Sequence, residues 1–246
     1  MILRQFLHRE PVAISYLFGC GGRGLAAVVD PLEPITPYLE AAAAGGMAIR
    51  FVIDTHIHAD HLSAGRALAA ATGAAYVLWH GADALFPFRG VADGEVLDLG
   101  NVTAEVWHLP GHTPEHLALL VTDHTRAEEP WVVLTGHTLM AGDLGRTELA
   151  TSAEAGACAL FASIARLQTL PDFLEVLPGA YAGSVCGRSL SGKPCTTIGF
   201  ERRYNRAFGI ADATEFVRVM LAEIPPPPPD AARIRAANAG RVLAPA

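Results

Sequence analysis

The sequence predicts one α/β domain in which helices cover the faces of β-sheets. Two observations indicate this class. Apolar runs of strand length come in two batches, and each batch is followed by segments with helical spacing of apolar residues. Neither internal repeats nor low-complexity linkers interrupt them. Because 51% of the 246 residues are hydrophobic, the chain can bury a sizeable core, and this length still suits a single sandwich or barrel.

The first half of the chain alternates strand-like and helix-like segments. Two strand-like runs flank the sequence GCGGRG, which formally matches the GxGxxG dinucleotide fingerprint. Another strand-like run follows it where a nucleotide site would need a helix, so we interpret it as a hairpin turn. In chain order, the segments predict strands at 14–18 and 25–30, a helix at 34–47 that ends at Gly45-Gly46, a strand at 49–54, a helix at 64–73 and a strand at 74–79.

The second half begins with a series of apolar runs and ends with helices. The expected elements are strands at 95–100, 102–111, 116–123 and 130–136, a long helix at 152–170, a last strand at 173–179 and a terminal helix at 213–224. Five prolines at 225–229 require an extended backbone, because proline fixes φ and has no N–H to donate. We expect a domain over 1–224 and a proline-rich arm over 225–246 that packs on it or extends from it. A ligand for a proline-binding domain is the alternative.

Composition excludes several classes of function. The net charge of −7 argues against a nucleic-acid partner, since there is no overall basic footprint. No apolar run approaches the roughly 18 residues of a membrane span, and we see no signal peptide. The four cysteines fit neither a zinc ribbon nor a CxxC redox pair, so we expect free thiols and a reducing, cytoplasmic location. The oligomeric state stays open, a homodimer included.

The heptapeptide THIHADH (55–61) directly follows an apolar run. Alternate residues of an extended segment face the same side, so His56 and His58 can bind one ion together. Asp60 repeats the same side, and His61 adds a further nitrogen beside it. A polar loop that is merely rich in histidine is the alternative, but the density of the HxHxDH pattern favours a metal site.

Two more histidines occupy equivalent places after other predicted strands. His112 follows the strand that ends in Pro-Gly, and His137 follows the strand that ends at Gly136. Loops at one edge of packed sheets gather to form a site. The repeated placement therefore predicts a metal pocket that combines His56 and His58 with His112 and His137.

In this order, the motifs THxHxDH, PGHT and TGxTLxxGDxGR resemble the metallo-β-lactamase superfamily. The resemblance covers nearly the whole chain, from SYLFGCG and AVVDP to the proline run. The segments GDLGRTEL, GSVCGRSLSG and TTIGFERRYN resemble its persulfide dioxygenase and glyoxalase II branch. The resemblance implies a four-layer αββα sandwich in which two mixed sheets pack face to face, helices lie outside, and metals bind at one edge of the sheets.

The departures from the family pattern concern the second metal. Binuclear hydrolases of the superfamily use a bridging aspartate in TGD, where this chain has His137. They also use a late histidine, where the loop PGAYAGS has Ala180. Of the family ligands for a second ion, only Asp60 and His61 would remain in this chain. Two ligands are too few to hold an ion tightly. We therefore expect one metal.

The ligands of a persulfide dioxygenase carry over to His56, His112 and His137, which would form a three-histidine face for one Fe(II). The lost carboxylate removes a negative charge and should raise the potential of the metal. Zn(II) is the alternative ion, with His56, His58 and His112 as the alternative ligand set. The alternative for His137 is that it points away and hydrogen-bonds to a ligand.

Other residues receive roles around the metal. We assign His58, Asp60 and His61 to catalysis, where they would orient a bound water or the sulfur of the substrate. We expect Arg146, Tyr181, Arg188 and Lys193 to bind the carboxylates of a glutathione-like substrate. A solvated basic face is the alternative for this region. For Arg146, a charge-assisted pair with Asp143 that holds their own loop is favoured over catalysis. Cys186 is interpreted as a structural thiol.

The favoured function is a mononuclear non-haem iron dioxygenase that oxidises glutathione persulfide, or a related small persulfide, with O2 to sulfite. The second hypothesis is a zinc hydrolase of a glutathione thioester, in which metal-bound water attacks the carbonyl. A third is a non-catalytic member that binds a metal or a thiol metabolite. Each would act on a small thiol compound, without nucleic acid or membrane.

Overall fold

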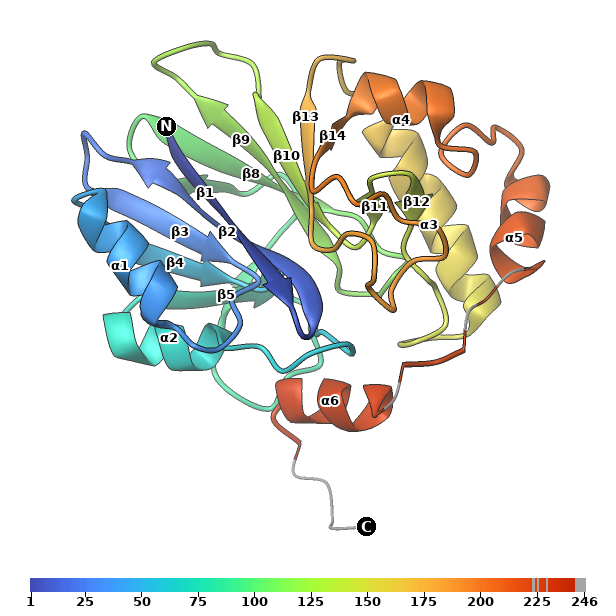
Figure 1. Cartoon of the computed structure of the whole chain (residues 1–246), viewed down its shortest axis with the longest axis horizontal. Coiled ribbons are helices and arrows are strands. Elements are labelled where there is room, and N and C mark those ends of the chain that lie inside the picture. The colour runs from blue at the N-terminus through green and yellow to red at the C-terminus, as the bar shows by residue number, and fades with distance from the viewer. Residues whose placement is uncertain (223, 225, 229, 242–246) are drawn as a thin grey trace.

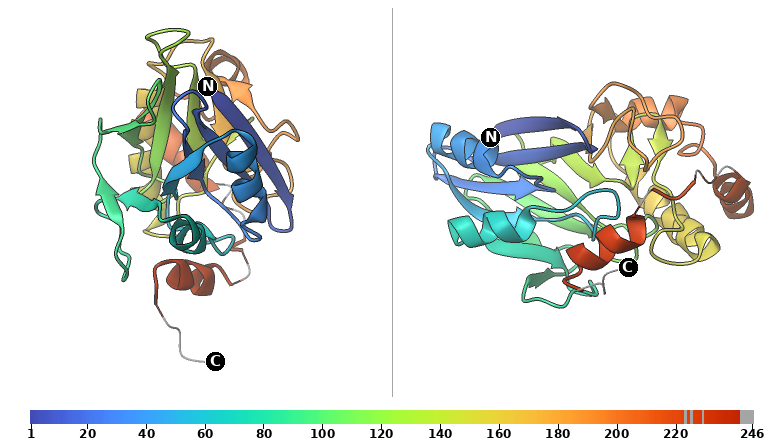
Figure 2. Two further views of the ribbon diagram at one scale, coloured as in Figure 1. Left: turned by 90° about the vertical axis from the view of Figure 1, so that its left-hand side faces the viewer. Right: turned by 60° about the horizontal axis from the view of Figure 1, so that its bottom comes forward.

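The computed structural model describes residues 1–222, 224, 226–228 and 230–241. Its elements form four layers, in the order helices, sheet, sheet, helices (Figure 1, Figure 2). Two six-stranded sheets of mixed strand direction pack face to face between the helices. This is the αββα sandwich that the resemblance implies.

The N-terminal part of the chain builds the first sheet. The hairpin around GCGGRG is present, and it joins two antiparallel strands as predicted. The later strands of this sheet run parallel to their neighbours. In spatial order they are β1 (Ile2–Arg9), β2 (Val12–Cys20), β3 (Leu25–Val29), β4 (Ala48–Ile53), β5 (Ala75–Trp79) and β6 (Arg89–Val91).

The second sheet is mostly antiparallel, with one parallel pair between β10 (Val132–Gly136) and β13 (Glu175–Pro178). In spatial order its strands are β14 (Thr196–Thr197), β13, β10, β9 (Leu117–Asp123), β8 (Val102–His108) and β7 (Val96–Asp98). A two-stranded sheet follows β10 in the chain and consists of β11 (Leu139–Met140) and β12 (Asp143–Leu144).

The helices cover the two outer faces. Parallel neighbours need crossover connections, and α1 (Thr36–Ala44) and α2 (Gly65–Thr72) provide them between β3, β4 and β5. Both pack on the outer face of the first sheet. The second sheet is covered by α3 (Ala153–Leu167), α4 (Ile198–Tyr204) and α5 (Ala213–Ala222). The chain ends with α6 (Ala231–Asn238).

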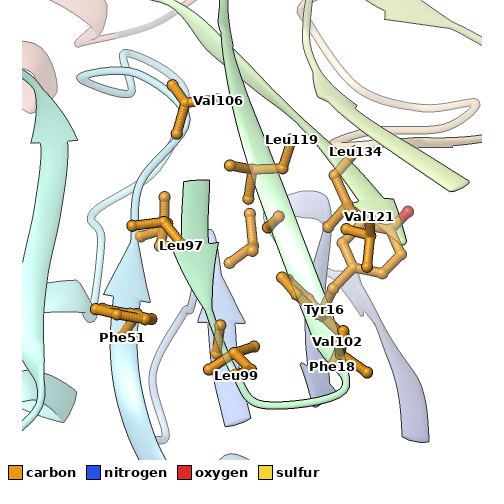
Figure 3. Packing of buried hydrophobic residues seen from close by; sticks show 14 of the residues in the cluster. Tyr16, Phe18, Phe51, Leu97, Leu99, Val102, Val106, Leu119, Val121 and Leu134 are labelled. Atoms are coloured by element: carbon orange, nitrogen blue, oxygen red, sulfur yellow. The ribbon is translucent and has the colours of Figure 1, made fainter. Parts of the chain in front are cut away.

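The main core lies between the sheets. Strand β2 shows how it forms, because successive side chains of a strand point to opposite faces. Ile14, Tyr16 and Phe18 point toward the second sheet and join the central cluster, whereas Leu17 packs under the first pair of helices. Figure 3 shows Tyr16 and Phe18 near side chains of the opposite sheet. Both faces of the strand are buried, so it reads as a continuous apolar run.

Several elements were not among the sequence-based expectations, the short strands β6, β11 and β12 included. Strand β1 was not predicted; it is an edge strand whose residues are largely half-buried or exposed, so its pattern is weak. Helix α4 was also missed, and the two-residue strand β14 follows the strand expected to be the last. The helix predicted at 213–224 is not the terminal one, because α6 follows the prolines.

The predicted C-terminal arm falls partly outside the described residues, which omit 225, 229 and 242–246. In the described part of the arm, α6 lies against the loop that follows β4 and contacts it through Arg235 and Asn238 (Figure 2). Among the described residues, no helix combines the length and the hydropathy that a membrane span needs.

Candidate metal centre

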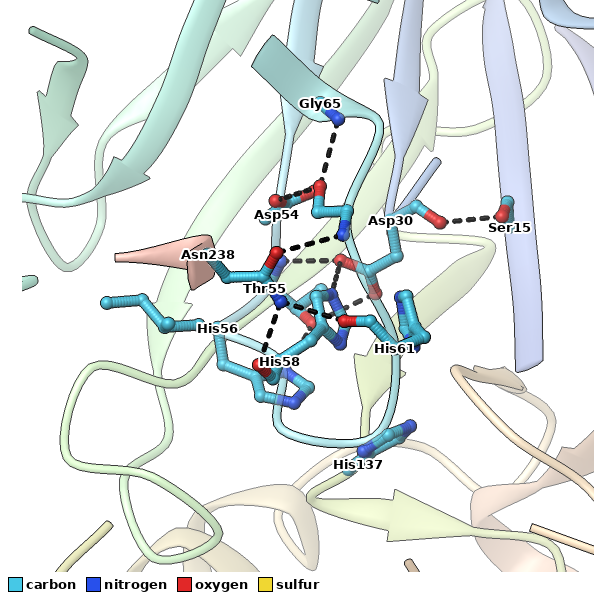
Figure 4. Close-up of polar contacts among 12 residues, drawn as sticks. Ser15, Asp30, Asp54, Thr55, His56, His58, His61, Gly65, His137 and Asn238 are labelled. Atoms are coloured by element: carbon cyan, nitrogen blue, oxygen red, sulfur yellow. Dashed lines mark hydrogen bonds and ion pairs between the residues drawn. The ribbon is translucent and has the colours of Figure 1, made fainter. Parts of the chain in front are cut away.

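Loops from both sheets meet at one edge of the sandwich and bring the predicted histidines together. His56 and His58 lie in the loop after β4, His112 lies after β8, and His137 directly follows β10. Figure 4 shows the histidine loop between the ends of the strands, with His137 opposite it. The strand ends therefore deliver side chains to one place, as their repeated position in the sequence predicts.

Three imidazoles form the centre of this cluster. One nitrogen from each of His56, His112 and His137 lies within 4.8 Å of the other two, and all three residues are buried. The ring centroid of His56 is 4.8 Å from that of His112 and 4.9 Å from that of His137. The Nδ1 atom of His137 lies 3.3 Å from the Nε2 atom of His112. His137 thus points into the cluster and not away from it.

A relay of hydrogen bonds orients His56. The hydroxyl of Thr55 donates to Oδ2 of Asp30 at 2.9 Å, so its oxygen can only accept from Nδ1 of His56, also at 2.9 Å. This leaves the Nε2 lone pair of His56 available, and Nε2 has no hydrogen-bond partner. Asp30 is a non-glycine residue with φ of 50°, a conformation that costs free energy and is often found at functional sites.

Main-chain groups orient the other two rings. Nδ1 of His112 donates to the carbonyl of Arg146 at 2.7 Å, so its Nε2 carries the free lone pair. The backbone N–H of His137 donates to Nε2 of His116 at 3.1 Å, and Thr138 contacts the other nitrogen of that ring. His116 therefore has both nitrogens occupied and acts as a support. Metal-binding histidines typically have such partners, which fix the tautomer.

The environment keeps the three central rings neutral. Burial, with neighbouring imidazoles, lowers the pKa of His112 to about 3. Burial lowers the pKa of His137 to about 4, although the charge of Asp60 opposes the shift. Burial and then His58 hold the pKa of His56 well below its ordinary value. Only a neutral imidazole can bind a metal, so the site presents its ligands in the required form.

The remaining residues of the motif form a second group beside the first. His58, Asp60 and His61 each offer an atom within 4.8 Å of the others. Nε2 of His58 lies 3.1 Å from Oδ1 of Asp30. Burial lowers the pKa of His58, but the charge and hydrogen bond of Asp30 outweigh it and raise that pKa well above its ordinary value. His58 is thus an imidazolium paired with a carboxylate, with Nδ1 facing Asp60 at 3.7 Å.

Unpartnered polar atoms show that the site is built for a cation. A buried donor or acceptor without a partner is costly, and native proteins rarely leave several together. In the described residues, seven of the nine buried side-chain atoms without hydrogen-bond partners gather here: Nε2 of His56, Nδ1 of His58, both oxygens of Asp60, both nitrogens of His61 and Nε2 of His137. Imidazole nitrogens and a carboxylate suit Fe(II) or Zn(II), so this donor set fits the implied metal.

Gly136 explains how the strands can approach so closely. Its φ is +50°, and a Cβ atom there would lie 2.6 Å from both Nε2 of His116 and Oγ1 of Thr55. No side chain fits between these groups without displacing them. The residue before His137 must therefore be glycine for the two histidine loops to meet.

The loop after β13 brings a thiol to the site in place of the missing histidine. Ala180 is buried and offers no ligand atom, whereas the sulfur of Cys186 groups with Asp60 and His137 within 4.8 Å. Burial, with a contribution from Asp60, raises the pKa of the Cys186 thiol well above its ordinary value. The thiol is therefore protonated at neutral pH, in keeping with a structural role.

Two of the four residues predicted to bind substrate are engaged in internal bonds. The guanidinium of Arg146 pairs with Glu148 and donates to the carbonyls of Val185 and Pro226 at 3.0 Å each. Arg188 pairs with Asp143 at 2.7 Å. The pair expected between Asp143 and Arg146 is thus replaced by two other pairs, because the loop after Cys186 brings Arg188 to Asp143. A substrate-binding role for these two arginines stays a prediction.

The other two lie on different surfaces. The hydroxyl of Tyr181 donates to the carbonyl of His8 at 2.8 Å and so ties its loop to the β1–β2 hairpin. Lys193 lines a cavity of about 210 Å³ over the loop before β14, with Cys195 and Glu201 among its other walls. The structure does not bring these two residues together with the histidines, and their contact with substrate also stays a prediction.

A separate cavity reaches the metal centre. It has a volume of about 330 Å³, and Asp60 forms part of its wall. The tip of the β1–β2 hairpin contributes Arg9 and Glu10, and the loop after β13 contributes Ser184. No local pattern indicates this use of the hairpin, because its residues lie about 50 positions from the histidine motif.

Sequence reasoning also missed the residues that support the ligands. Asp30 ends the strand-like run before β4, and its position at the same sheet edge could have suggested it. Glu115 lies within the PGHTPEH segment, where it accepts a hydrogen bond from the backbone N–H of Ile57 at 3.0 Å. Asn238 lies in α6 and could not be found from any local pattern.

The lowered pKa values of the buried histidines lead to a prediction about the stability of the metal-free protein at acidic pH. Their pKa values in the folded state, about 3 for His112 and about 4 for His137, lie below the ordinary 6.5, so the unfolded chain binds protons first as the pH falls. The free energy of unfolding should therefore fall below about pH 6.5, by up to about 1.4 kcal/mol per pH unit for each ring. The His58–Asp30 pair has the opposite sign, but its effect appears only above pH 6.5, where His58 would otherwise lose its proton.

Urea unfolding of the metal-free protein between about pH 7 and pH 5 measures this effect. The His124→Ala variant is the control, because that imidazole is exposed and contacts only Thr103 and Glu128, away from the metal centre. A stability that stays constant over this range in the wild type would contradict a cluster of buried neutral imidazoles.

Comparisons with known proteins agree with this geometry. The model of the Metallo-beta-lactamase superfamily matches residues 12–182. A hydroxyacylglutathione hydrolase of Synechococcus sp. (strain CC9902) is 33% identical over 178 residues, which are 69% of this chain and 68% of that protein. The chain spans 56–68% of the length of this and seven further relatives that carry the same name.

Two solved structures are similar over nearly the whole chain. A metallo-β-lactamase from Staphylococcus aureus subsp. aureus COL has a TM-score of 0.91 at 32% identity, and the match covers 96% of this chain and 72% of that one. The structure of ETHE1 from Myxococcus xanthus has a TM-score of 0.83 at 30% identity, with 98% and 99% coverage. Both matches combine a similar fold with a sequence identity of at least 30%.

Proposed function

The chain belongs to the metallo-β-lactamase superfamily, and from this premise we propose that it is a mononuclear non-haem iron enzyme that oxidises a small persulfide to sulfite. The meeting of His56, His112 and His137, each with a nitrogen atom that faces the other two rings, carries the proposal. The relatives named hydroxyacylglutathione hydrolase and the ETHE1 structure fit the glyoxalase II and persulfide dioxygenase branch. Glutathione persulfide is the substrate we propose.

The donor arrangement favours one ion over two. A second ion beside Asp60 would need either His58, which Asp30 holds as an imidazolium, or His137, which the first ion uses. Ala180 supplies no further ligand. An ion held by three neutral imidazoles would keep its remaining coordination positions for substrate, as the two-histidine, one-carboxylate face of non-haem iron oxygenases does.

When bound, Fe(II) would supply the redox chemistry by which O2 oxidises the outer sulfur of the persulfide. O2 and water are consumed, and sulfite, protons and the thiol are released. Asp60 would accept a hydrogen bond from the S–H group or from water at Oδ2, since Oδ1 already lies 3.1 Å from Nδ1 of His61. Burial opposes its ionisation, but His61 and His137 hold its pKa well below its ordinary value, so the carboxylate is charged. His58 and His61 flank this carboxylate and fix it in place.

The cavity beside Asp60 is the route that we propose for the substrate. Its volume of about 330 Å³ suits a small thiol carrier. Arg9 on the hairpin offers a cation to a carboxylate of that carrier, and Glu10 offers an anion to its ammonium group. An amino-acid-like thiol such as glutathione carries both charges.

A zinc-dependent thioester hydrolase is the second candidate. The names of the curated relatives favour it, and three neutral imidazoles also suit Zn(II). Zinc would lower the pKa of a bound water toward about 7, which Asp60 could orient toward a carbonyl carbon. The loss of the aspartate at position 137 argues against a hydrolase that uses two ions.

Metal analysis and oxygen uptake distinguish the candidates. Protein purified without air should contain about one iron per chain. It should consume O2 when glutathione persulfide is added, and sulfite should form in step. Zinc alone, with cleavage of S-lactoylglutathione and no O2 uptake, would replace the proposal by the second candidate. Protein that is loaded with either metal and shows neither activity would overturn both and indicate a non-catalytic member.

A further inference from the structure

We propose that the C-terminal segment from Pro226 to Asn238 is a brace that holds the metal-binding loops in their ligating conformation, with Asn238 as the principal positioning residue. The proposal builds on the metal site but requires neither a particular metal nor a particular reaction. Under this proposal, the proline-rich arm positions the loops of the metal centre.

The side chain of Asn238 binds the backbone of the histidine motif at both ends. Its Nδ2 group donates to the carbonyl of His58 at 2.9 Å and to that of His61 at 2.8 Å. Its Oδ1 atom accepts from the backbone N–H of Ser63 at 3.0 Å. An asparagine offers two donor hydrogens and one amide oxygen, so all its polar groups are used. Figure 4 shows Asn238 reaching the loop from α6.

These bonds replace the secondary structure that the loop lacks. Residues 54–64 form neither helix nor strand, yet most of them are buried. Buried backbone carbonyls need partners, and no described backbone N–H donates to those of His58 and His61. The amide of Asn238 supplies both partners from a distant part of the chain.

Arg235 makes a second connection, one turn earlier in α6. Its Nη1 atom donates to the carbonyl of Ile57 at 2.6 Å and to Oε1 of Glu115 at 3.0 Å. The same carboxylate oxygen accepts the N–H of Ile57. Glu115 is buried in the loop that carries His112, so this network joins two loops that bring ligands from different sheets. Without the arginine, a buried carboxylate would lose its counter-charge.

The other end of the brace reaches the support of His112. The carbonyl of Pro226 accepts a hydrogen bond from Nη1 of Arg146 at 3.0 Å. The carbonyl of that arginine in turn accepts the Nδ1–H of His112. Proline fixes φ, so the described prolines at 226–228 extend stiffly from this anchor. The brace therefore contacts the surroundings of the ligands at both of its ends.

The composition of α6 suggests that it is held mainly by these polar contacts. Asn238 is the one buried residue of the helix, and none of its side chains belongs to the hydrophobic clusters of the described residues. A helix that merely completed the core would present an apolar stripe. Loss of a single amide should therefore loosen the metal loop while the sandwich stays folded.

The test compares Asn238→Ala with Arg233→Ala, a control on the same helix whose exposed guanidinium pairs only with Asp230. Zn²⁺ is loaded into each protein, and its transfer to a chelator is timed. Partners of metal ligands typically contribute about 10–100-fold in affinity. Asn238→Ala should release Zn²⁺ at least about tenfold faster than the wild type. Arg233→Ala should match the wild type.

Hydrogen exchange of the metal-free proteins supplies an independent readout. In Asn238→Ala, the backbone amide hydrogens of residues 55–63 should exchange faster than in the wild type. Those of β2 and β9 should exchange at an unchanged rate. Unchanged release and unchanged exchange at 55–63 would overturn the brace, as would a uniform rise over the whole sandwich. If Asn238→Ala does not fold, the similarly sized Asn238→Asp, which lacks the donor hydrogens, is subject to the same criteria. A wild type that binds no Zn²⁺ would refute the metal site, and the exchange data would still decide the brace.

Discussion

Replacement of His112 by alanine should abolish metal binding and activity. Its ring brings a ligand from the second sheet to a loop of the first, so the remaining imidazoles cannot enclose an ion. Loss of a partner of a ligand costs about 10–100-fold in affinity, and loss of the ligand itself should cost more than about 100-fold. Isothermal titration with Zn²⁺ and the rate of substrate turnover measure the two effects.

The size of this effect separates a ligand from an ordinary buried histidine. His124→Ala is the control, since it removes an exposed imidazole and should leave both quantities unchanged. The metal-free His112→Ala protein should stay folded, because the hydrophobic clusters do not include this ring and only the carbonyl of Arg146 loses its donor. A variant that retains wild-type metal affinity would show that the ion, if any, binds elsewhere.

Replacement of His137 by aspartate should change which metal the site prefers. The substitution restores a carboxylate and adds a negative charge beside the cation. Hard oxygen ligands favour Fe(II) over softer ions, so the ratio of Fe(II) to Zn(II) affinity should rise, by about tenfold or more. The potential of bound iron should fall, since the added charge stabilises the ferric state. Competition between the two metals and redox titration measure these changes.

His137→Asn is the matched control for this experiment. The asparagine has the size of the aspartate without its charge. It should therefore weaken the binding of both metals and leave the ratio of Fe(II) to Zn(II) affinity nearer to that of the wild type. If the aspartate variant keeps the wild-type metal profile, the His137 imidazole lies outside the coordination sphere. The alternative ligand set of His56, His58 and His112 would then gain support.

Much of the fold was predictable because local patterns and global packing agree. Strand β4 is an apolar run of the right length, and the histidine motif follows it directly. The helices α1 and α2 end at glycines, Gly45 and Gly73, as the pattern indicates. Edge strand β1 could not be recognised, because half-exposed positions carry little periodic signal.

The candidate site shows the same division between local and distant information. The histidines were identifiable because each follows a strand, and strand ends meet at one edge of the sheets. The brace was not, because Asn238 contacts carbonyls that are 177 and 180 residues away in the chain. Every residue has a backbone carbonyl, so a contact with one cannot be recognised from residue types. An asparagine near the end of a short polar helix looks like any surface residue until the fold places it.

The anomalous difference map of Fe(II)-loaded crystals, measured at the iron edge, tests the central claim most directly. We predict one peak, within about 2.2 Å of nitrogen atoms from His56, His112 and His137. A peak that lies between Asp60 and Cys186, or one that contacts His56 while His137 points elsewhere, would contradict the three-histidine centre on which the proposed chemistry depends.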